Sequence, residues 1–93
     1  MITTKHIECI VSGRVQMVMY RDFATRSAKR LGVRGFVQNQ KDGTVLVVAE
    51  GEERVLHEYI AQLHKGSIFA HVQDVRVTWG DSTGEFSVFT ICY

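Results

Sequence analysis

The sequence predicts an α+β fold in which two helices pack on one face of a mainly antiparallel sheet. Three observations lead to this prediction. Short runs alternate between apolar and polar residues, two longer runs repeat apolar residues at helical spacing, and an Asp-Gly pair separates two strand-like runs. With 93 residues, of which 45% are hydrophobic, the chain has the size of one domain with its own core. We therefore expect residues 1–93 to form a single domain.

A change of period marks the first strand and the first helix. Apolar and polar residues alternate over His6–Ser12, which is typical of a strand with one buried face. From about Arg21 the apolar residues recur at helical spacing, and Gly32 then supplies a C-terminal stop. A strand that ends at Gly13 and a helix from about Arg21 to Leu31 are therefore predicted.

Two β-rich runs follow, and their connection predicts a hairpin. The runs are Gly35–Asn39 and Thr44–Glu50, and the segment Gln40–Gly43 between them contains the Asp-Gly pair. Asp-Gly is favoured in tight hairpin turns because these residues tolerate a positive φ. The second and third strands are therefore expected to pair.

The second half of the chain predicts another helix and two more strands. The Glu52-Glu53 pair provides carboxylates that suit a helix N-terminus, an apolar stripe follows at helical spacing, and Gly66 ends the run. Alternating residues then predict a strand over Val72–Trp79 and, after a turn at Gly80–Gly84, a last strand over Phe86–Tyr93.

The predicted order of elements restricts the topology. It is strand-helix-strand-strand-helix-strand, with one additional C-terminal strand. A ferredoxin-like split βαβ sandwich is the simplest architecture that buries both helical stripes and keeps the crossover connections right-handed. Both helices then cover the same face of the sheet. This fold alone does not establish a function.

Charge and cysteine usage argue against several classes of function. Eleven basic side chains stand against ten acidic ones, so the net charge of +1 at pH 7 provides no broad basic surface for a nucleic acid. The run Thr44–Val48 lacks the aromatic residues on which RNA-recognition modules of this topology stack bases. Cys9 and Cys92 form no CxxC or other ligand pair, so we expect neither a zinc site nor a redox motif.

The sequence also lacks the features of a targeting or membrane segment. The N-terminal run Met1–His6 has no apolar stretch like that of a signal peptide. No later segment approaches the roughly 18 apolar residues that a membrane-spanning helix needs. We therefore expect a cytoplasmic protein without a membrane partner.

The segment Gly13–Arg21, between the first strand and the first helix, is the candidate functional loop. It leads into a helix N-terminus, where backbone N–H groups have no intrahelical acceptor and attract anions. Arg21 adds a guanidinium that can contact two phosphate oxygens, although a cation in the first helical turn opposes the helix dipole by about 0.3 to 1 kcal/mol. A bound anion would compensate for this. The alternative is that Arg21 simply pairs with Asp22 or with solvent.

Two stretches of the sequence resemble the acylphosphatases, small enzymes that cleave the carboxyl–phosphate bond of acyl phosphates. The segment Gly13–Arg21, read as G-R-V-Q-M-V-M-Y-R, is similar to the family's phosphate-binding loop G-x-V-Q-G-V-x-F-R. The segment Gly35–Asn39, followed by Asp42–Val45 and Gly51, fits the family pattern throughout. The run Ala28–Val33 and the chain length add to the likeness, which spans nearly the whole sequence.

The resemblance implies an activity and a set of site residues. The activity is metal-independent hydrolysis of an acyl phosphate to a carboxylate and inorganic phosphate, in which Arg21 binds the phosphate and Asn39 orients the attacking water. The remaining residues of the loop would bind the substrate: Arg14, Val15, Gln16, Met17, Val18, Met19 and Tyr20. Taken alone, Asn39 would be interpreted as a cap of the hairpin turn. We expect a monomer that acts on a small-molecule acyl phosphate without a metal or cofactor.

The loop departs from the family pattern at three positions. Met17 stands where the family has Gly, Met19 where a small residue is frequent, and Tyr20 where Phe is usual. A positive φ at residue 17 would strain the loop by about 1 to 2 kcal/mol, whereas a negative φ would change little. Both methionines would also narrow the mouth of the site or cover it with apolar surface. The alternative function is a domain that binds anions or a protein partner without turnover because of Met17.

Overall fold

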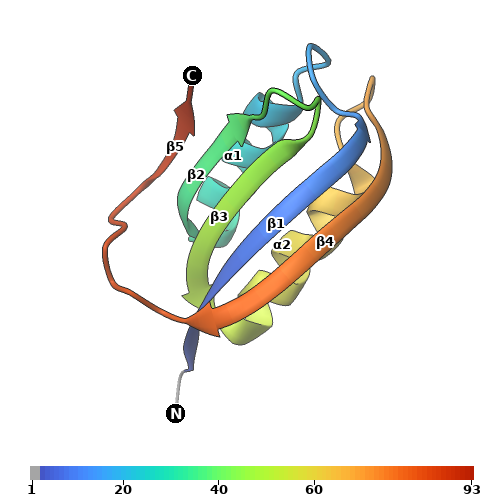
Figure 1. The fold of residues 1–93 in the computed structure, drawn as a ribbon. Coiled ribbons are helices and arrows are strands. Elements are labelled where there is room, and N and C mark those ends of the chain that lie inside the picture. Colours follow the sequence, from blue (N-terminus) through green and yellow to red (C-terminus); the bar gives the residue numbers. More distant parts are fainter. Residues whose placement is uncertain (1–2) are drawn as a thin grey trace.

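The computed structural model describes residues 3–93. Met1 and Ile2, which belong to the predicted domain and to the N-terminal run considered as a signal peptide, lie outside the described residues. The elements are, in chain order, β1 (Thr4–Arg14), α1 (Tyr20–Leu31), β2 (Arg34–Asn39), β3 (Val45–Glu52), α2 (Glu53–Lys65), β4 (His71–Asp81) and β5 (Phe89–Cys92). Both helices lie on the same face of the sheet (Figure 1). No helix of the described chain is long and apolar enough to cross a membrane.

The sheet has five strands in the order β4-β1-β3-β2-β5. β1 pairs antiparallel with β3 and with β4, and β2 pairs antiparallel with β3. Only the pairing of β5 with β2, at one edge of the sheet, is parallel. The predicted α+β class, the ferredoxin-like arrangement and the mainly antiparallel sheet are therefore confirmed.

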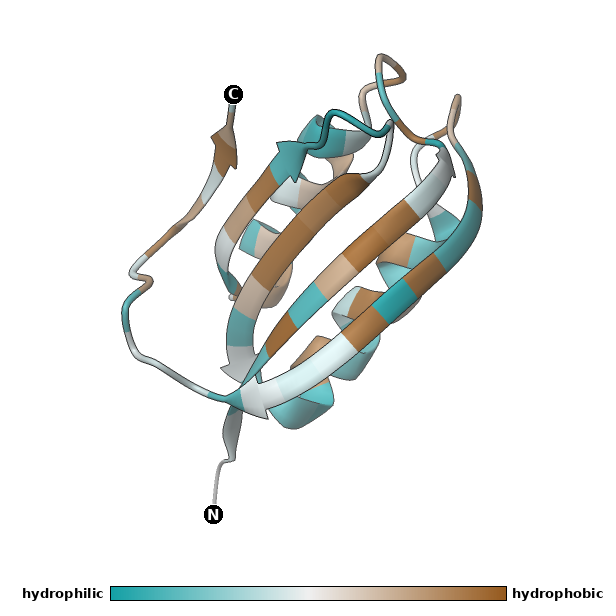
Figure 2. Cartoon of the chain, viewed as in Figure 1, coloured by the Kyte–Doolittle hydropathy of each residue, from teal (hydrophilic) through white to brown (hydrophobic). Residues whose placement is uncertain are grey.

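The core lies between the sheet and the two helices. On β1 the side chains of Ile7, Cys9 and Val11 are completely buried, and they belong to the same apolar cluster as Leu56 and Tyr59 of α2. The central strands carry most of the hydrophobic residues of the sheet, whereas the helices alternate between hydrophobic and hydrophilic positions (Figure 2). The alternation in the sequence thus predicts the buried face of β1 correctly.

β1 and β4 are longer than predicted. β1 covers Thr4–Arg14, whereas the alternation began at His6 and the strand was predicted to end at Gly13, and β4 covers His71–Asp81 instead of Val72–Trp79. The reason is that the backbone ladder between these two strands continues beyond the residues that alternate in polarity. The ladder has a bulge at Gly13, where φ is 119° and a Cβ atom would collide with the backbone carbonyl of His71. This glycine allows the chain to leave the sheet and enter the candidate loop.

The C-terminal strand is shorter than predicted. β5 covers Phe89–Cys92 instead of Phe86–Tyr93, and the preceding segment crosses from the end of β4 to the opposite edge of the sheet (Figure 1). The crossing begins where Ser82 Oγ, the Thr83 N–H and hydroxyl, and the Gly84 N–H donate hydrogen bonds to the Glu50 carboxylate over 2.7 to 3.0 Å. The N–H groups of Thr83 and Gly84 thus donate to the Glu50 carboxylate and not to a neighbouring strand, so the segment does not continue as a strand.

Candidate active site

The loop between β1 and α1 has an unusual backbone conformation. Met17 has φ of 60° and Met19 has φ of 62°, and these are the only non-glycine residues of the described chain with positive φ. Alternation of left-handed residues with residues of negative φ turns successive N–H groups toward one side and forms an anion-binding concavity. The positive φ at Met17 is the condition under which strain was predicted at this residue. The alternating backbone of the loop is that of an anion-binding concavity.

The backbone donors of this loop are available to a ligand. Within residues 3–93, the N–H groups of residues 15–19 donate hydrogen bonds to no protein acceptor. The first hydrogen bond of α1 runs from the Phe23 N–H to the Met19 carbonyl, so the N–H groups of residues 20–22 have no intrahelical acceptor either. The loop and the helix N-terminus together thus supply a continuous series of unused donors.

Two side-chain contacts fix the loop to its surroundings. The Gln16 amide donates hydrogen bonds to the backbone carbonyls of Gln40 and Thr44, each over 2.8 Å. On the other side, the Ser67 hydroxyl donates to the Val18 carbonyl over 2.9 Å. The loop is therefore attached both to the β2–β3 hairpin and to the segment that follows α2.

Tyr20, the first residue of α1, is a core residue as well as a loop residue. Its side chain is 1% exposed, and its hydroxyl donates a hydrogen bond to the Leu63 carbonyl over 2.7 Å. Burial raises the pKa of this phenol well above its ordinary value, so it remains a neutral donor. The hydroxyl that distinguishes Tyr20 from the phenylalanine of the family pattern thus binds the last turn of α2.

Arg21 is the second residue of α1, and its guanidinium is free of carboxylate partners within the described chain. Its Cζ atom lies 4.9 Å from the centroid of the Tyr93 ring, in cation–π contact. Asp22 instead pairs with Arg26, with 2.9 Å between Oδ2 and Nε. The alternative in which Arg21 pairs with Asp22 is therefore wrong.

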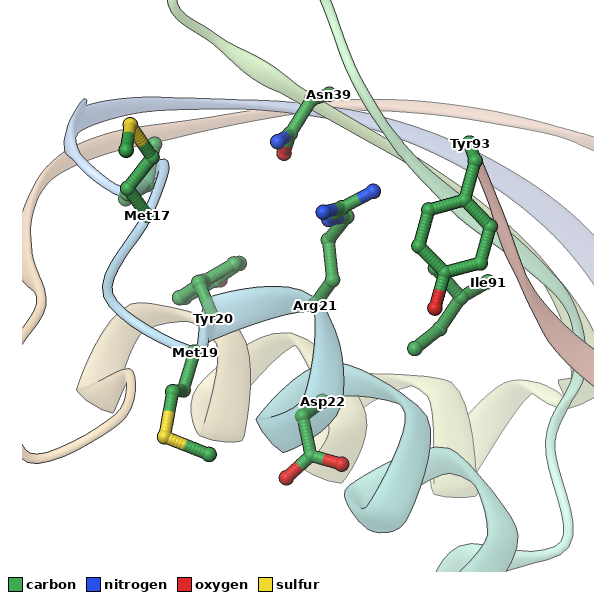
Figure 3. A pocket seen from close by; sticks show the side chains of 9 residues that line it. Met17, Met19, Tyr20, Arg21, Asp22, Asn39, Ile91 and Tyr93 are labelled. Carbon is green, nitrogen blue, oxygen red and sulfur yellow. The ribbon is translucent and has the colours of Figure 1, made fainter.

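Asn39 is the last residue of β2 and has an unsatisfied acceptor. Its Oδ1 atom is buried and has no hydrogen-bond partner among the described residues. Figure 3 shows the Asn39 amide and the Arg21 guanidinium pointing toward each other from two different elements. A buried carboxamide oxygen without a protein donor is rare, and it is satisfied when a water or ligand binds beside it.

These side chains surround a hollow of about 170 Å³. Six of the predicted residues line it, and they are Val15, Met17, Met19, Tyr20, Arg21 and Asn39. The predicted residues Arg14, Gln16 and Val18 do not line it. Three further residues line the hollow and were not predicted as site residues: Asp22, Ile91 and Tyr93. The position of Asp22 beside Arg21 was a usable signal, whereas nothing in the sequence indicates that β5 lies next to β2.

The model of the acylphosphatase family matches residues 7–91 of the chain. The chain belongs to the acylphosphatase family. An acylphosphatase from Dehalococcoides mccartyi is 41% identical to it over 88 residues, which cover 94% of this chain and 97% of that protein. One from Salinibacter ruber is 39% identical over 89 residues, covering 96% and 94%. The crystal structure of acylphosphatase from Bacillus subtilis, 36% identical, has a TM-score of 0.93 and covers 96% of this chain and 99% of that one.

The strain at Met17 leads to a first prediction for this acylphosphatase-family chain. Met17→Gly should raise the free energy of unfolding by about 1 kcal/mol, because glycine adopts a positive φ without a steric penalty. The Met17 side chain is 99% exposed and contributes little packing that the variant would lose. Urea denaturation measures the change. As a control, Lys41→Gly in an exposed turn, where φ is negative, should lower stability, and an equal loss in both variants would contradict strain at residue 17.

Proposed function

We propose that this chain hydrolyses the carboxyl–phosphate bond of acyl phosphates, with Arg21 and the loop amides binding the phosphoryl group and Asn39 holding the attacking water. Membership of the acylphosphatase family supports this reaction. The observation that carries the residue roles is the unsatisfied Asn39 Oδ1, which faces the unpaired Arg21 guanidinium at a hollow beside unused backbone donors.

The proposed step is a single displacement at phosphorus. The oxygen of the water forms a bond to phosphorus, the bond between phosphorus and the carboxyl oxygen breaks, and the carboxylate leaves with the electron pair. The amide of Asn39 cannot act as a base near neutral pH. Its Oδ1 can, however, accept a hydrogen bond from the water and so orient a lone pair of the water oxygen toward phosphorus. The proton lost by the water passes to a phosphate oxygen.

The free-energy barrier falls mainly through positioning and charge stabilisation. A carboxylate is a good leaving group, so the step needs no strong acid to protonate it. The guanidinium and the backbone N–H groups would stabilise the charge that is spread over the phosphoryl oxygens in the transition state. These groups supply the chemistry without a metal or cofactor in this proposal. The substrate is a small-molecule acyl phosphate.

The proposal also covers the state of the protein and the other loop residues. Residues 1–93 form one domain that acts as a monomer in the cytoplasm and binds no nucleic acid. Gln16 and Val18 serve the substrate through the backbone of the loop, because their side chains do not line the hollow, and Arg14 is the last residue of β1, directly before this loop. The Gln16 side chain additionally holds the loop in place through its two hydrogen bonds.

Hydrolysis of benzoyl phosphate, followed by the loss of its absorbance, tests the proposal. Asn39→Ala should lower kcat by about 10²-fold with little change in KM, because a water-positioning group acts mainly in the transition state. Gln38→Ala, at the neighbouring strand position outside the hollow, is the matched control and should keep kcat within about twofold. Equal kcat values for the wild type and Asn39→Ala would exclude the water-positioning role. Binding of inorganic phosphate by a wild-type protein that hydrolyses nothing would support the anion-binding alternative instead.

A further inference from the structure

Exposed apolar side chains gather around the mouth of the proposed active site. Seven large hydrophobic side chains are exposed in the described chain, and three of these, Met17, Met19 and Tyr93, line the hollow. Two more, Ile68 and Phe69, follow α2 in the segment that the Ser67–Val18 hydrogen bond attaches to the loop. Such clustering of exposed apolar surface at a site indicates an apolar ligand group.

The direction of the reaction indicates where the acyl group of the substrate lies. In a displacement at phosphorus the leaving oxygen departs opposite to the attacking water. With the water beside Asn39, the acyl group must therefore extend to the other side of the phosphoryl group. In Figure 3 Asn39 points toward the Arg21 guanidinium from one side, whereas Met19 and Asp22 lie on the other side with their side chains extending away from Asn39. In the proposed complex the acyl group would therefore extend to the side of the hollow that Met19 and Asp22 line.

The charges on this side do not favour an anionic acyl group. Among residues 3–93, Arg21 is the only cationic residue that lines the hollow, and the phosphoryl group binds to its guanidinium in the proposed complex. Asp22 is negative, and its charge is balanced by Arg26 at 2.9 Å. A second carboxylate or phosphate on the acyl part would therefore find no counter-charge among the lining residues.

We propose that the acyl-group subsite selects acyl phosphates with an uncharged apolar acyl chain of several carbons, and that Met19 is its specificity-determining side chain. This inference rests on the proposed function, because it assumes that the phosphoryl group binds at Arg21 and the water at Asn39. Met19 is 64% exposed in the free protein and has a flexible side chain that adapts to different chains. A bound alkyl chain would bury part of this surface and part of its own.

The test is a series of linear substrates: acetyl, butanoyl and hexanoyl phosphate. Linear carboxylates are nearly equal as leaving groups, so differences in kcat/KM report contacts of the chain. A methylene that contacts the exposed lining of the hollow is only partly buried and gains about half of the free energy of full burial. We therefore expect kcat/KM to rise roughly twofold for each methylene. Over the four methylenes from acetyl to hexanoyl phosphate the rise should be about 16-fold. Succinyl phosphate, with a terminal carboxylate, should not exceed acetyl phosphate.

Two matched variants separate Met19 from general surface hydrophobicity. Met19→Gln keeps the length of the side chain and removes its apolar character, and it should reduce the hexanoyl-to-acetyl ratio of kcat/KM to below about fivefold. Val88→Gln changes another exposed apolar residue, which does not line the hollow, and should leave the ratio as in the wild type.

The outcomes distinguish this inference from the function on which it rests. If the wild type hydrolyses none of the substrates, the proposed function itself is wrong. If it hydrolyses acetyl phosphate and the series shows no dependence on chain length, only the apolar subsite is overturned. If the wild type shows the chain-length dependence and Met19→Gln has the same hexanoyl-to-acetyl ratio of kcat/KM, the assignment to Met19 is overturned. A ratio that falls in this variant and not in Val88→Gln supports the proposal.

Discussion

Arg21→Ala should lower kcat/KM for benzoyl phosphate by about 10³-fold, the largest effect on activity expected from one substitution. The guanidinium contacts the hollow, has no carboxylate partner in the described chain and lies beside the unused donors of the loop. Arg21→Lys keeps the charge and loses the planar pair of donors, so it should recover about tenfold at most. Colorimetric rates at several substrate concentrations give the comparison.

The stability of the same variants shows whether the loss comes from the site. Arg21 is a cation near the N-terminus of α1, where it opposes the helix dipole, so Arg21→Ala should fold at least as stably as the wild type. Inorganic phosphate should raise the unfolding temperature of the wild type and not that of Arg21→Ala. Arg30→Ala, in the last turn of the same helix, is the control and should retain activity within about twofold. Activity in Arg21→Ala close to that of Arg30→Ala would contradict the phosphate-binding role.

Glu50→Ala should have the largest effect on stability, about 3 kcal/mol or more. The carboxylate is 1% exposed and interacts with five groups. These are the donors of Ser82, Thr83 and Gly84 and, at 2.6 Å, the Nδ1 atom of His6. Its removal breaks all five of these interactions and releases the segment that leads to β5. Urea denaturation measures the loss, and Glu58→Ala, at an exposed position of α2, should change stability by less than about 0.5 kcal/mol.

The Glu50–His6 pair also predicts how stability depends on pH. Burial opposes the charge on Glu50, but hydrogen bonds from Thr83, His6 and Gly84 outweigh it and lower its pKa well below the ordinary 4.5. The stabilisation from Glu50 is therefore complete above about pH 4.5 and is lost as the pH falls through the lowered pKa. Burial likewise opposes the charge on His6, and its contacts with Glu50 and Glu8 raise its pKa above 6.5. This second contribution is complete below pH 6.5 and is lost as the pH rises through the raised pKa.

Stability should thus be highest between about pH 4.5 and pH 6.5, as far as these two groups determine it. The urea midpoint of His6→Asn should lose the decline on the alkaline side and keep the decline on the acidic side. A wild-type midpoint that rises steadily from pH 6 to pH 9 would contradict the assignment of His6.

The order and type of most helices and strands could be predicted from the sequence, because the patterns that indicate them are local. Alternation over His6–Ser12 and helical spacing up to Leu31 each depend on neighbouring residues, and the glycines at positions 32 and 66 lie directly after the two helices. Strand ends were less predictable, since β1 and β4 extend through pairing between distant residues. The short β5 and its crossing were not predictable from periodicity, because a buried carboxylate holds Ser82–Gly84. An acidic residue at the end of the apolar run Val45–Glu50 was the signal of that contact.

The candidate site was predicted in part. Arg21, Asn39 and the loop came from the resemblance, and the structure brings the two side chains to one hollow. The consequence of a methionine at position 17 depended on the sign of φ, which is a property of the folded loop and not of its composition. Ile91 and Tyr93 reach the hollow only because β5 pairs with β2, and no spacing in the sequence records a parallel pairing.

The double hydrogen bond of Gln16 has a mechanical consequence for turnover. Its amide links the β1–α1 loop to Gln40 and Thr44, which flank the turn directly after Asn39. Movement of the hairpin is therefore coupled to the β1–α1 loop, so the two halves of the proposed site move together. In the proposed complex this coupling would keep the water beside Asn39 at a constant distance from a phosphoryl group held by the loop, from one catalytic cycle to the next.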